Sequence, residues 1–529
     1  MNSNLGKQSM AIWSPDLGNG YYQNPIIHAD YSDPDVIRVG EDFFMVASSF
    51  NMSPCLPVLH SKDLVNWTII NHVFEKLPFS YYDEPRQSEG VWAPSIRYHK
   101  GQFWVFFATP DDGIFMSKTN NPFGTWSSLH LVKKTKGWID PCPFWDEDGQ
   151  AYLVHAFAKS RIGFKSVLHI CKMKPDGTEL LDEGTLVFDG NAHHPTIEGP
   201  KLYKRNGFYY IVAPAGGVTD GWQTILRSKN VYGPYEDKIV LAQGSTAING
   251  PHQGAWVELK SGESWFIHFQ DKGAYGRITH LQPMSWEDDW PLIGSNINAN
   301  GVGEPVMSWK KPLDVLTTPT VPQTSDDFSG DRLGLQWQWR ANVKREWYSL
   351  LDNKLRLFSR NRTEGVTTLF NTGQIVTQKF PAFVFTATTS VSFHPHDEDD
   401  VTGLIVFGHD YAGLKIRRGC AAISISFFNG YYNGEKAEED ETLIKQIEAE
   451  ALYLRVEVKE HAICQFSYSV DQIGFQEIGS PFQANSGGWS GAQLGIFCLN
   501  EGVRTSSGYA DFDWFYISEN EKGDVDGNI

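Results

Sequence analysis

Cysteine is scarce in this chain: the 529 residues include six, and no two of them form a CxxC pair. Three fall in each half of the chain, so neither half can pair all of its cysteines in disulfides. The six are Cys55, Cys142, Cys171, Cys420, Cys464 and Cys498. Free, mostly buried thiols are the simplest interpretation, and they favour a reducing compartment.

The sequence also lacks long apolar runs and an excess of positive charge. No run is long enough to span a membrane, and residues 1–13 lack the apolar core of a signal peptide. We therefore expect a cytoplasmic protein, or a periplasmic one if a signal peptide was removed before the numbering begins. The 45 basic residues are outnumbered by 63 acidic ones, which gives a net charge of -18. This balance argues against nucleic acid or an anionic membrane as partner and suits a neutral substrate.

Aromatic residues are plentiful, at 14% of the chain with 18 tryptophans, and they recur in a repeated pattern. Each repeat has a proline-marked start, a short strand, a glycine turn and an aromatic-aliphatic strand. The turn glycines are Gly40, Gly101, Gly149, Gly207 and Gly262, which lie 61, 48, 58 and 55 residues apart. One small sheet per period of this length is typical of a radial β-propeller, so five copies predict five blades.

The residue at the start of each repeat bears on what such a propeller could do. These positions, seven to ten residues before the turn glycine, are Asp33, Ala93, Asp140, Glu198 and His252. Equivalent positions of a radial array form a ring around its axis, so we expect the three carboxylates to converge on one site. The alternative is that each carboxylate caps a turn or faces water, as most do. Three in register make that alternative the weaker one.

Two carboxylates on different blades can hydrolyse a glycosidic bond. One acts as a base on a water molecule, and the other protonates the leaving oxygen from the opposite side of the sugar. Inversion requires a separation of roughly 6.5 to 9.5 Å, so that the water fits between base and sugar. A third carboxylate near the acid would raise the pKa of the acid and keep it protonated near neutral pH.

The pattern of polar and apolar residues changes after the fifth repeat. We assign residues 1–313 to the propeller and the proline-containing residues 314–325 to a linker. From 326 to 519 the strands alternate polar and apolar residues, as antiparallel sheets packed in a sandwich do. We expect the acidic run 435–441 to be a solvated hairpin loop and residues 520–529 to be a polar tail. The predicted fold class is all-β, a five-bladed β-propeller followed by a C-terminal antiparallel β-sandwich.

Short motifs in the first half form an ordered set. They are Asn24-Pro25-Ile26, Ser32-Asp33-Pro34, Ser61-Lys62-Asp63-Leu64, Trp92-Ala93-Pro94, Trp138-Ile139-Asp140-Pro141, and Glu198-Gly199-Pro200 followed by Leu202-Tyr203. The second half begins Asp326-Asp327-Phe328 and ends Tyr509-Ala510-Asp511-Phe512-Asp513-Trp514-Phe515. Together they resemble glycoside hydrolase family 43, in its two-domain form with a concanavalin-like or jelly-roll-like sandwich. That family consists of five-bladed, inverting β-xylosidases, α-L-arabinofuranosidases and arabinanases.

The resemblance implies a role for each carboxylate of the ring. Asp33 would be the general base, Glu198 the general acid, and Asp140 the residue that tunes and orients the acid. Asp35 is the competing base, but Asp33 is the one that precedes a proline in register with Asp140. Arg277 resembles the arginine with which the family contacts substrate hydroxyls; a surface ion pair is its alternative.

Further candidates lie beside the expected mouth of the propeller. By repeat position, Trp92 and Phe50 could stack on a pentose ring or simply pack at the rim. The resemblance implies that His252 lies near the central channel, where it would contact substrate or a water-ligated calcium; a structural hydrogen bond is the alternative. A second hypothesis places calcium between the first and last strands of the sandwich, at Asp326 and Asp513. The chemistry itself requires no cofactor.

These features predict an exo-acting, inverting glycosidase that releases pentose from non-reducing ends of hemicellulose oligosaccharides, with β-1,4-xylosidase preferred. The alternative is an α-L-arabinofuranosidase acting on arabinoxylan, arabinan or xyloglucan side chains, because the two pentoses present similar hydroxyls. A non-catalytic carbohydrate-binding propeller is an alternative of another class. The sandwich could bind carbohydrate, cover the propeller or lend a loop that closes the cleft. The expected partner is a xylo- or arabino-oligosaccharide, and the sequence leaves open whether the chain forms a homo-oligomer.

Overall fold

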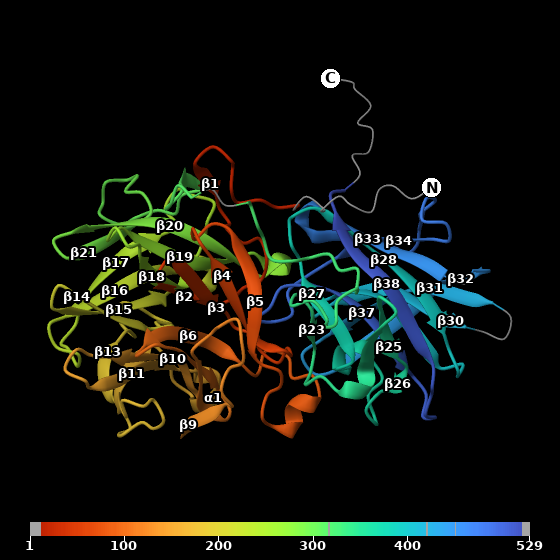
Figure 1. Ribbon diagram of the computed structural model, residues 1–529, viewed down its shortest axis with the longest axis horizontal. Coiled ribbons are helices and arrows are strands. Elements are labelled where there is room, and N and C mark those ends of the chain that lie inside the picture. The colour runs from red at the N-terminus through yellow and green to blue at the C-terminus, as the bar shows by residue number, and fades with distance from the viewer. Residues whose placement is uncertain (1–11, 316–317, 419–421, 450, 521–529) are drawn as a thin grey trace.

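The computed structural model describes residues 12–315, 318–418, 422–449 and 451–520 and shows two β-rich domains packed side by side (Figure 1). Five four-stranded antiparallel sheets form the first domain, and two eight-stranded sheets form the second. The predicted fold class is therefore confirmed. The N-terminal residues 1–11 and the tail from 521 lie outside the described residues. Within the described part of the chain, no helix is long and apolar enough to cross a membrane.

Each blade of the propeller is built from four consecutive strands. The first blade contains β2 (Asp35–Val39), β3 (Asp42–Val46), β4 (Cys55–Ser61) and β5 (Trp67–Phe74). The second contains β6 (Trp92–His99), β7 (Gln102–Thr109), β8 (Gly113–Thr119) and β9 (His130–Lys134). The third contains β10 (Trp138–Trp145), β11 (Ala151–Phe157), β12 (Val167–Met173) and β13 (Thr185–Asp189). The fourth contains β14 (Lys201–Arg205), β15 (Phe208–Ala215), β16 (Trp222–Ser228) and β17 (Glu236–Ala242). The fifth contains β18 (His252–Glu258), β19 (Ser264–Asp271), β20 (Arg277–Glu287) and β21 (Trp290–Ile293).

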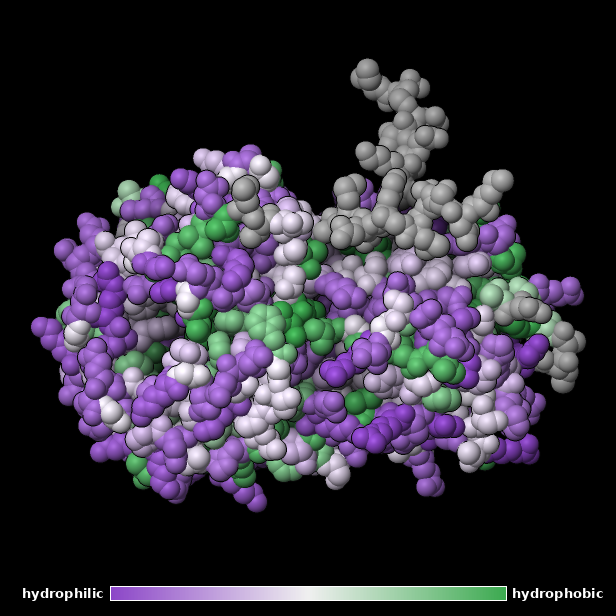
Figure 2. Space-filling model, in the orientation of Figure 1, coloured by the Kyte–Doolittle hydropathy of each residue, from purple (hydrophilic) through white to green (hydrophobic). Residues whose placement is uncertain are grey.

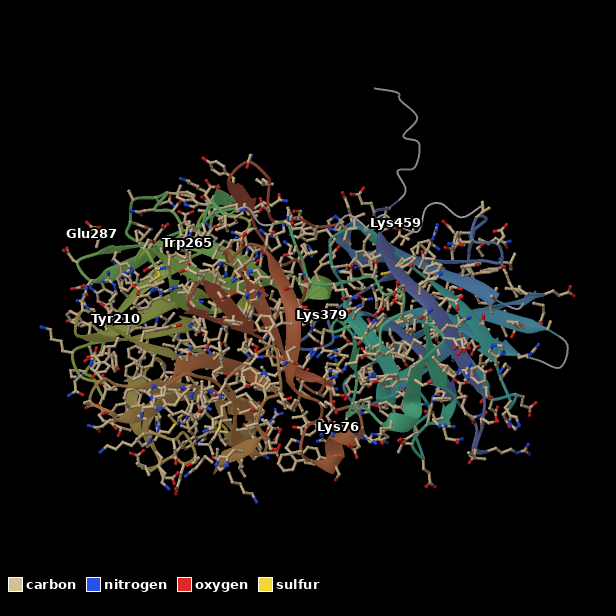
Figure 3. All side chains as sticks on the ribbon, in the orientation of Figure 1. Lys76, Tyr210, Trp265, Glu287, Lys379 and Lys459 are labelled. Atoms are coloured by element: carbon tan, nitrogen blue, oxygen red, sulfur yellow. The ribbon has the colours of Figure 1, made fainter. Side chains whose placement is uncertain are left out.

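The glycines that predicted the blades lie between the first and second strands of each sheet. All five have a left-handed backbone, with φ between 66° and 87°, a conformation that glycine adopts without a Cβ penalty. Apolar side chains fill the gaps between neighbouring blades. Between the first and fifth blades, for example, Phe43 and Met45 pack in one buried cluster with Trp265 and Ile267. Figure 3 shows Trp265 within the propeller, far from the sandwich.

The N-terminal arm closes the ring of blades. Its strand β1 (Tyr21–Gln23) pairs with β22 (Ser308–Lys310), which follows the last blade. Just beyond β1, the Asn24 side-chain amide donates hydrogen bonds to the carbonyls of Leu281 and Val306, each 2.8 Å long. Because these contacts join the two ends of the propeller, the arm holds the first blade beside the fifth without exchanging a strand between blades.

The sandwich consists of two facing sheets. One has the order β23 (Gln338–Trp339), β27 (Ile375–Lys379), β37 (Gln493–Asn500), β29 (Asp400–Phe407), β30 (Tyr411–Arg418), β31 (Ile423–Tyr432) and β32 (Ala437–Ile447), with β26 (Arg360–Asn361) beside β37. The other has the order β24 (Tyr348–Leu351), β25 (Lys354–Phe358), β38 (Tyr509–Ser518), β28 (Phe385–His394), β33 (Ala451–Lys459), β34 (Ile463–Ser469) and β35 (Gln476–Glu477), with β36 (Phe482–Gln483) beside β34. Alternate side chains of both sheets, such as Leu404, Leu454 and Phe512, meet in one buried core.

The prediction of a solvated acidic loop at 435–441 is wrong for most of that run. Residues 437–447 form the edge strand β32 instead. Lys415 is buried in the adjoining part of the sheet, and its ammonium contacts Glu439 at 2.9 Å and Glu441 at 3.3 Å. Arg417 contacts Glu441 at 2.9 Å. The acidic residues therefore serve as partners of two cations on β30, which lies on the other side of β31 in the same sheet.

The two domains are joined by direct backbone contacts as well as by the linker. Ser53 of the propeller and Trp339 of the sandwich exchange two backbone hydrogen bonds, of 2.9 and 2.6 Å. The Asn51 side chain donates to the carbonyl of Arg340 at 2.6 Å. Figure 3 places Lys379 at this boundary. The face of the molecule in Figure 2 is mainly hydrophilic, with scattered apolar patches. The contacts hold one edge of the sandwich against the propeller.

Helices are few and short in the described residues. They are α1 (Lys159–Ile162), α2 (Gly217–Asp220), η1 (Ser80–Asp83), η2 (Gly273–Tyr275), η3 (Arg345–Trp347), η4 (Leu369–Asn371) and η5 (Glu460–Ala462). Five cysteines are described, and all five are free and buried, as the sequence predicts. Cys420 lies outside the described residues.

Candidate active site

The starts of the five repeats meet at one end of the propeller axis. They all line a single cavity of about 400 Å³, a volume suited to a small ligand. The residues at these positions are Asp33, Ala93, Asp140, Glu198 and His252. In the second, third and fifth blades the register of the first strand pair shifts at this point, which turns the strand at the cavity. The structure therefore brings together the three carboxylates that the sequence places in register.

Two of the carboxylates occupy a strained backbone conformation. Asp33 and Asp140 have φ values of 56° and 57°, which residues with a Cβ rarely adopt. Both are almost fully buried, at 5% and 3% exposure. Such strain is kept where the surroundings fix the backbone, and it is frequent at functional sites. Here it occurs at equivalent positions in two blades, so the same local turn aims both carboxylates into the cavity.

The Asp33 carboxylate is held by hydroxyls and a guanidinium. The Ser48 hydroxyl donates to its Oδ2 at 2.6 Å and the Ser32 hydroxyl at 2.7 Å. Arg277 lies 3.5 Å from its Oδ1 and donates to the Ser32 hydroxyl at 2.8 Å. These partners leave Oδ1 the less encumbered oxygen. Arg277, expected to reach the substrate, is thus a buried neighbour of Asp33 and not a surface ion pair.

Asp140 is tied to the backbone beside Glu198. Its Oδ2 accepts a 2.7 Å hydrogen bond from the Gly199 N–H. Gly199 has a φ of 59°, and a Cβ there would lie 2.3 Å from the Gln253 side chain, so another residue would be strained and would displace Gln253. Burial raises the pKa of Asp140, and the negative charge of Asp33 raises it further. The Gly199 hydrogen bond opposes this shift by stabilising the charged form.

Glu198 is the carboxyl group best suited to hold a proton. Its side chain is 26% exposed toward the cavity, and its nearest polar neighbour is the His252 Nε2 at 3.5 Å. Burial in the site raises the pKa of Glu198, and the charges of Asp140 and Asp33 raise it further, against the effect of Arg277. Asp140 has a backbone N–H to stabilise its charge and Glu198 has no such donor, so the proton of the pair resides on Glu198.

His252 is a buried, uncharged member of the site. It is 1% exposed, and burial lowers its pKa to about 3. Neither ring nitrogen has a hydrogen-bond partner within the described chain, although its Nε2 lies 3.5 Å from Glu198. An unpaired donor and acceptor at the base of a cavity can serve the hydroxyls of a ligand or a water molecule.

The residues of the calcium hypothesis in the sandwich, Asp326 and Asp513, have other contacts in the structure. Among the described residues, no group of three or more His, Cys, Asp or Glu side chains is placed to hold a metal ion. Asp326 accepts hydrogen bonds from Trp337 and from the backbone of Phe328. Asp513 contacts the ammonium of Lys354 at 2.8 Å. Both carboxylates thus have protein partners in the sandwich.

Asp35, the competing candidate for the base, does not line the cavity. It is fully buried and accepts hydrogen bonds of 2.7 Å from the Ile96 N–H and from Arg97. Its carboxylate joins the first strands of two blades, which is a structural role. Phe50 and Trp92 do line the cavity, as their repeat positions suggest. The Trp92 indole donates to the Ser88 carbonyl at 2.9 Å and is therefore held in place.

The sandwich contributes one wall of the cavity through Trp489, which the sequence analysis missed. Its ring lies 6.4 Å from that of Trp92 in an edge-to-face arrangement, and the Arg277 guanidinium lies 5.4 Å from its centre. Gly491 donates to Asp30 at 2.9 Å and Ala492 to the Ala274 carbonyl at 2.7 Å, which ties this loop to the propeller. The only sequence signal is the pair of glycines before Trp489, and that is too weak to place the loop.

Other site residues missed by the sequence analysis support the ring from behind or line its rim. They are Ser32, Ser48, Lys165, Lys201 and Gln253. They occupy no shared position in the repeat, so periodicity could not select them.

Two family models match the chain over the two domains just described. The model for glycosyl hydrolases family 43 matches residues 22–291, and that for the beta xylosidase C-terminal concanavalin A-like domain matches residues 325–518. The chain belongs to glycoside hydrolase family 43. This membership makes it a glycosidase and fits the convergence of three carboxylates at the mouth of a five-bladed propeller.

Individual members of family 43 are similar to this glycosidase over almost its whole length. A putative beta-xylosidase of Xylanibacter ruminicola is 42% identical over 489 residues, which cover 92% of this chain and 87% of that protein. A non-reducing end alpha-L-arabinofuranosidase of Bacteroides ovatus is 28% identical, with 96% and 97% covered. The crystal structure of a family 43 protein from Bacillus licheniformis matches with a TM-score of 0.80 at 26% identity, covering 94% of this chain and 100% of that one.

Proposed function

We propose that this glycosidase is an exo-acting, inverting β-1,4-xylosidase. The observation that carries the proposal is the pairing of two unlike carboxyl groups across one cavity. Asp33, on the first blade, accepts hydrogen bonds from the hydroxyls of Ser32 and Ser48 and lies 3.5 Å from Arg277. Glu198, on the fourth blade, has a raised pKa and holds a proton. A base and an acid on opposite sides of a sugar are what single displacement at the anomeric carbon requires.

In this mechanism the Asp33 carboxylate accepts a proton from a water molecule, which attacks the anomeric carbon from below the sugar ring. Glu198 gives its proton to the glycosidic oxygen as the bond to the leaving sugar breaks. Asp140 keeps Glu198 protonated through its negative charge and fixes its position through the Gly199 N–H. Arg277 and His252 line the same cavity and are the proposed contacts to the hydroxyls of the terminal pentose.

Exo action is supported by the loop that carries Trp489. Because the sandwich places this loop against the propeller mouth, the cavity is closed on that side by Trp489, whose ring meets that of Trp92 edge to face. A long polysaccharide would need an open groove through both sides. We therefore propose that one terminal sugar enters and that the rest of the oligosaccharide extends outward.

The preference for xylose rests on the higher similarity to a xylosidase, and the arabinofuranosidase of Bacteroides ovatus supports the second candidate. Initial rates on nitrophenyl β-xylopyranoside and nitrophenyl α-L-arabinofuranoside test the choice. A higher kcat/KM on the arabinofuranoside would favour the second candidate. NMR of the first product formed from xylobiose tests inversion, for which we expect α-xylose. Shortening of long xylan by internal cuts would contradict exo action.

A further inference from the structure

A buried lysine near the carboxylates of the cavity has no ion-pair partner among the residues that the structure describes. Lys201 is the first residue of β14, three positions after Glu198, and it is 1% exposed. Its ammonium donates to the Pro94 carbonyl and to the Ser95 hydroxyl, each at 2.8 Å. In the described part of the chain no carboxylate lies within ion-pairing distance of it. Burying a charge costs free energy unless another charge compensates it. We therefore expect a negative group in the neighbourhood of the Lys201 ammonium.

The path of the Lys201 side chain identifies the compensating group. Lys201 belongs to the fourth blade, whereas Pro94 and Ser95 belong to β6 of the second blade. The side chain therefore crosses in front of β10, the first strand of the third blade that lies between them. Asp140 is on β10 and is bonded to Gly199, two residues before Lys201. The ammonium is close enough to Asp140 for its positive charge to lower the pKa of that carboxyl group.

A charge count of the cavity agrees with this pairing. With Glu198 protonated, the site holds two carboxylates, Asp33 and Asp140, and two buried cations, Arg277 and Lys201. Arg277 accompanies Asp33 at 3.5 Å, which leaves Lys201 for Asp140. Lys159 and Lys165 also line the cavity but are not buried. The four buried charges balance in the protonation state that inversion requires, and without Lys201 one buried negative charge would be left over.

We infer that Lys201 is a positioning residue for the proton of the reaction: its buried ammonium keeps Asp140 ionised, so that the single proton shared by the acidic pair stays on Glu198. Lys201 touches neither substrate nor reacting atoms, and it acts through Asp140. This inference rests on the proposed roles of Asp140 and Glu198.

The other charged groups around the channel have partners of their own. Asp35 pairs with Arg97 at 2.7 Å, and Arg97 also donates to the Cys142 sulfur and lies over the Tyr203 ring. Asp271 lies 3.8 Å from Arg277 and is one third exposed. Asp30 accepts from the backbone of Arg277 and Gly491, and Lys165 donates to Thr196 at the cavity rim. His252 is neutral. None of them replaces Lys201 beside Asp140.

The first test is the pH dependence of kcat/KM for xylobiose in Lys201→Met. Without the ammonium, Asp140 takes up a proton more readily, and we expect the acidic limb of the profile to move upward by about one pH unit. Lys204→Met is the matched control, because Lys204 lies on the same strand and pairs with Asp146 outside the cavity. It should leave the limb in place. A uniform loss of activity in Lys201→Met with no movement of the limb would show a merely structural lysine.

The second test does not depend on activity or on the folding of that single variant. Asp140→Asn leaves the Lys201 ammonium buried without a counter-charge, so its melting temperature should fall. Adding Lys201→Met to Asp140→Asn should then raise the melting temperature, although it removes two hydrogen bonds. If the double variant melts below Asp140→Asn, the two charges do not compensate each other and the inference fails. A failure of the xylosidase proposal would instead appear as absent activity on xylosides with this stability pattern intact.

Discussion

The exchange of Glu198 for glutamine isolates the proton that the proposed mechanism transfers. The Glu198 side chain makes no hydrogen bond to another described residue, and its nearest polar neighbour is His252 at 3.5 Å. Glutamine has the same shape and the same charge as the protonated acid, so Asp140 and Asp33 keep their surroundings. We therefore expect little change in melting temperature. The variant lacks only a proton to donate.

The expected loss of kcat/KM in Glu198→Gln depends on the leaving group of the substrate. General acid catalysis contributes about 10² to 10⁴ in rate, which corresponds to about 3 to 5 kcal/mol of transition-state stabilisation. Xylobiose departs as a sugar alcohol and needs the proton, so kcat/KM for xylobiose should fall by that full factor. A nitrophenolate departs as a stable anion, so the loss on nitrophenyl β-xylopyranoside should be about tenfold or less. The alkaline limb of the pH profile, which reports the loss of the Glu198 proton, should disappear on the nitrophenyl substrate.

The assay is a pair of kcat/KM values for each variant, with melting temperature measured alongside. Glu258→Gln is the control, because Glu258 lies on the first strand of the fifth blade, is 45% exposed and lies 3.8 Å from Arg205. It should behave as the unaltered enzyme on both substrates. Equal losses on xylobiose and on the nitrophenyl xyloside would refute the role of Glu198 as acid, and unchanged turnover would favour a carbohydrate-binding propeller without catalysis.

Further predictions concern the base, the backbone and the pocket wall. Asp33→Ala should lower kcat by several orders of magnitude on both substrates, because no group replaces the base; near-normal turnover would exclude that role. Gly199→Ala should lower activity and should also lower the free energy of unfolding by about 1 to 3 kcal/mol, because the φ of 59° is unfavourable and the new Cβ meets Gln253. An unchanged melting temperature would contradict this prediction. Trp489→Ala should raise KM for xylobiose more than it lowers kcat, measured by initial rates. For the unaltered enzyme, the raised pKa of Glu198 should keep kcat/KM high above the usual pKa of a glutamate and let it fall as pH rises through the raised value.

Periodicity was sufficient to predict the blades and the convergence of the repeat starts on one cavity. Proline starts and turn glycines recur because every blade contains the same strand entry and the same tight turn. Equivalent positions of a closed array of blades must face one axis. Asp33, Asp140 and Glu198 could therefore be brought together from residue spacing alone. The register of the prolines likewise favoured Asp33 over Asp35, because Asp33 precedes a proline at the same repeat position as Asp140. The structure shows Asp35 bonded to Arg97 instead.

Contacts between distant segments were outside the reach of such reasoning. Trp489 enters the cavity because its loop is bonded to Asp30 and Ala274, residues of the other domain. The acidic segment with Glu439 and Glu441 was assigned to a loop because its charges suggested solvent. In the structure it is an edge strand whose carboxylates pair with Lys415, two strands away in the same sheet. In both cases the deciding partner is remote in sequence and occupies no repeat position.

The charges of the cavity could be predicted neither from the local sequence pattern nor from the overall composition. A net charge of -18 suggests surplus negative charge everywhere, yet the buried carboxylates Asp33 and Asp140 are accompanied by the buried cations Arg277 and Lys201. Lys201 belongs to a strand of the fourth blade and reaches the second, so its proximity to Asp140 follows from the path of one side chain. Nearby charges decide which of two adjacent carboxyl groups holds a shared proton. The position of the Lys201 ammonium therefore influences whether Asp140 or Glu198 can act as the acid. The assignment of Glu198 therefore depends on tertiary structure even though its position was evident from the repeat.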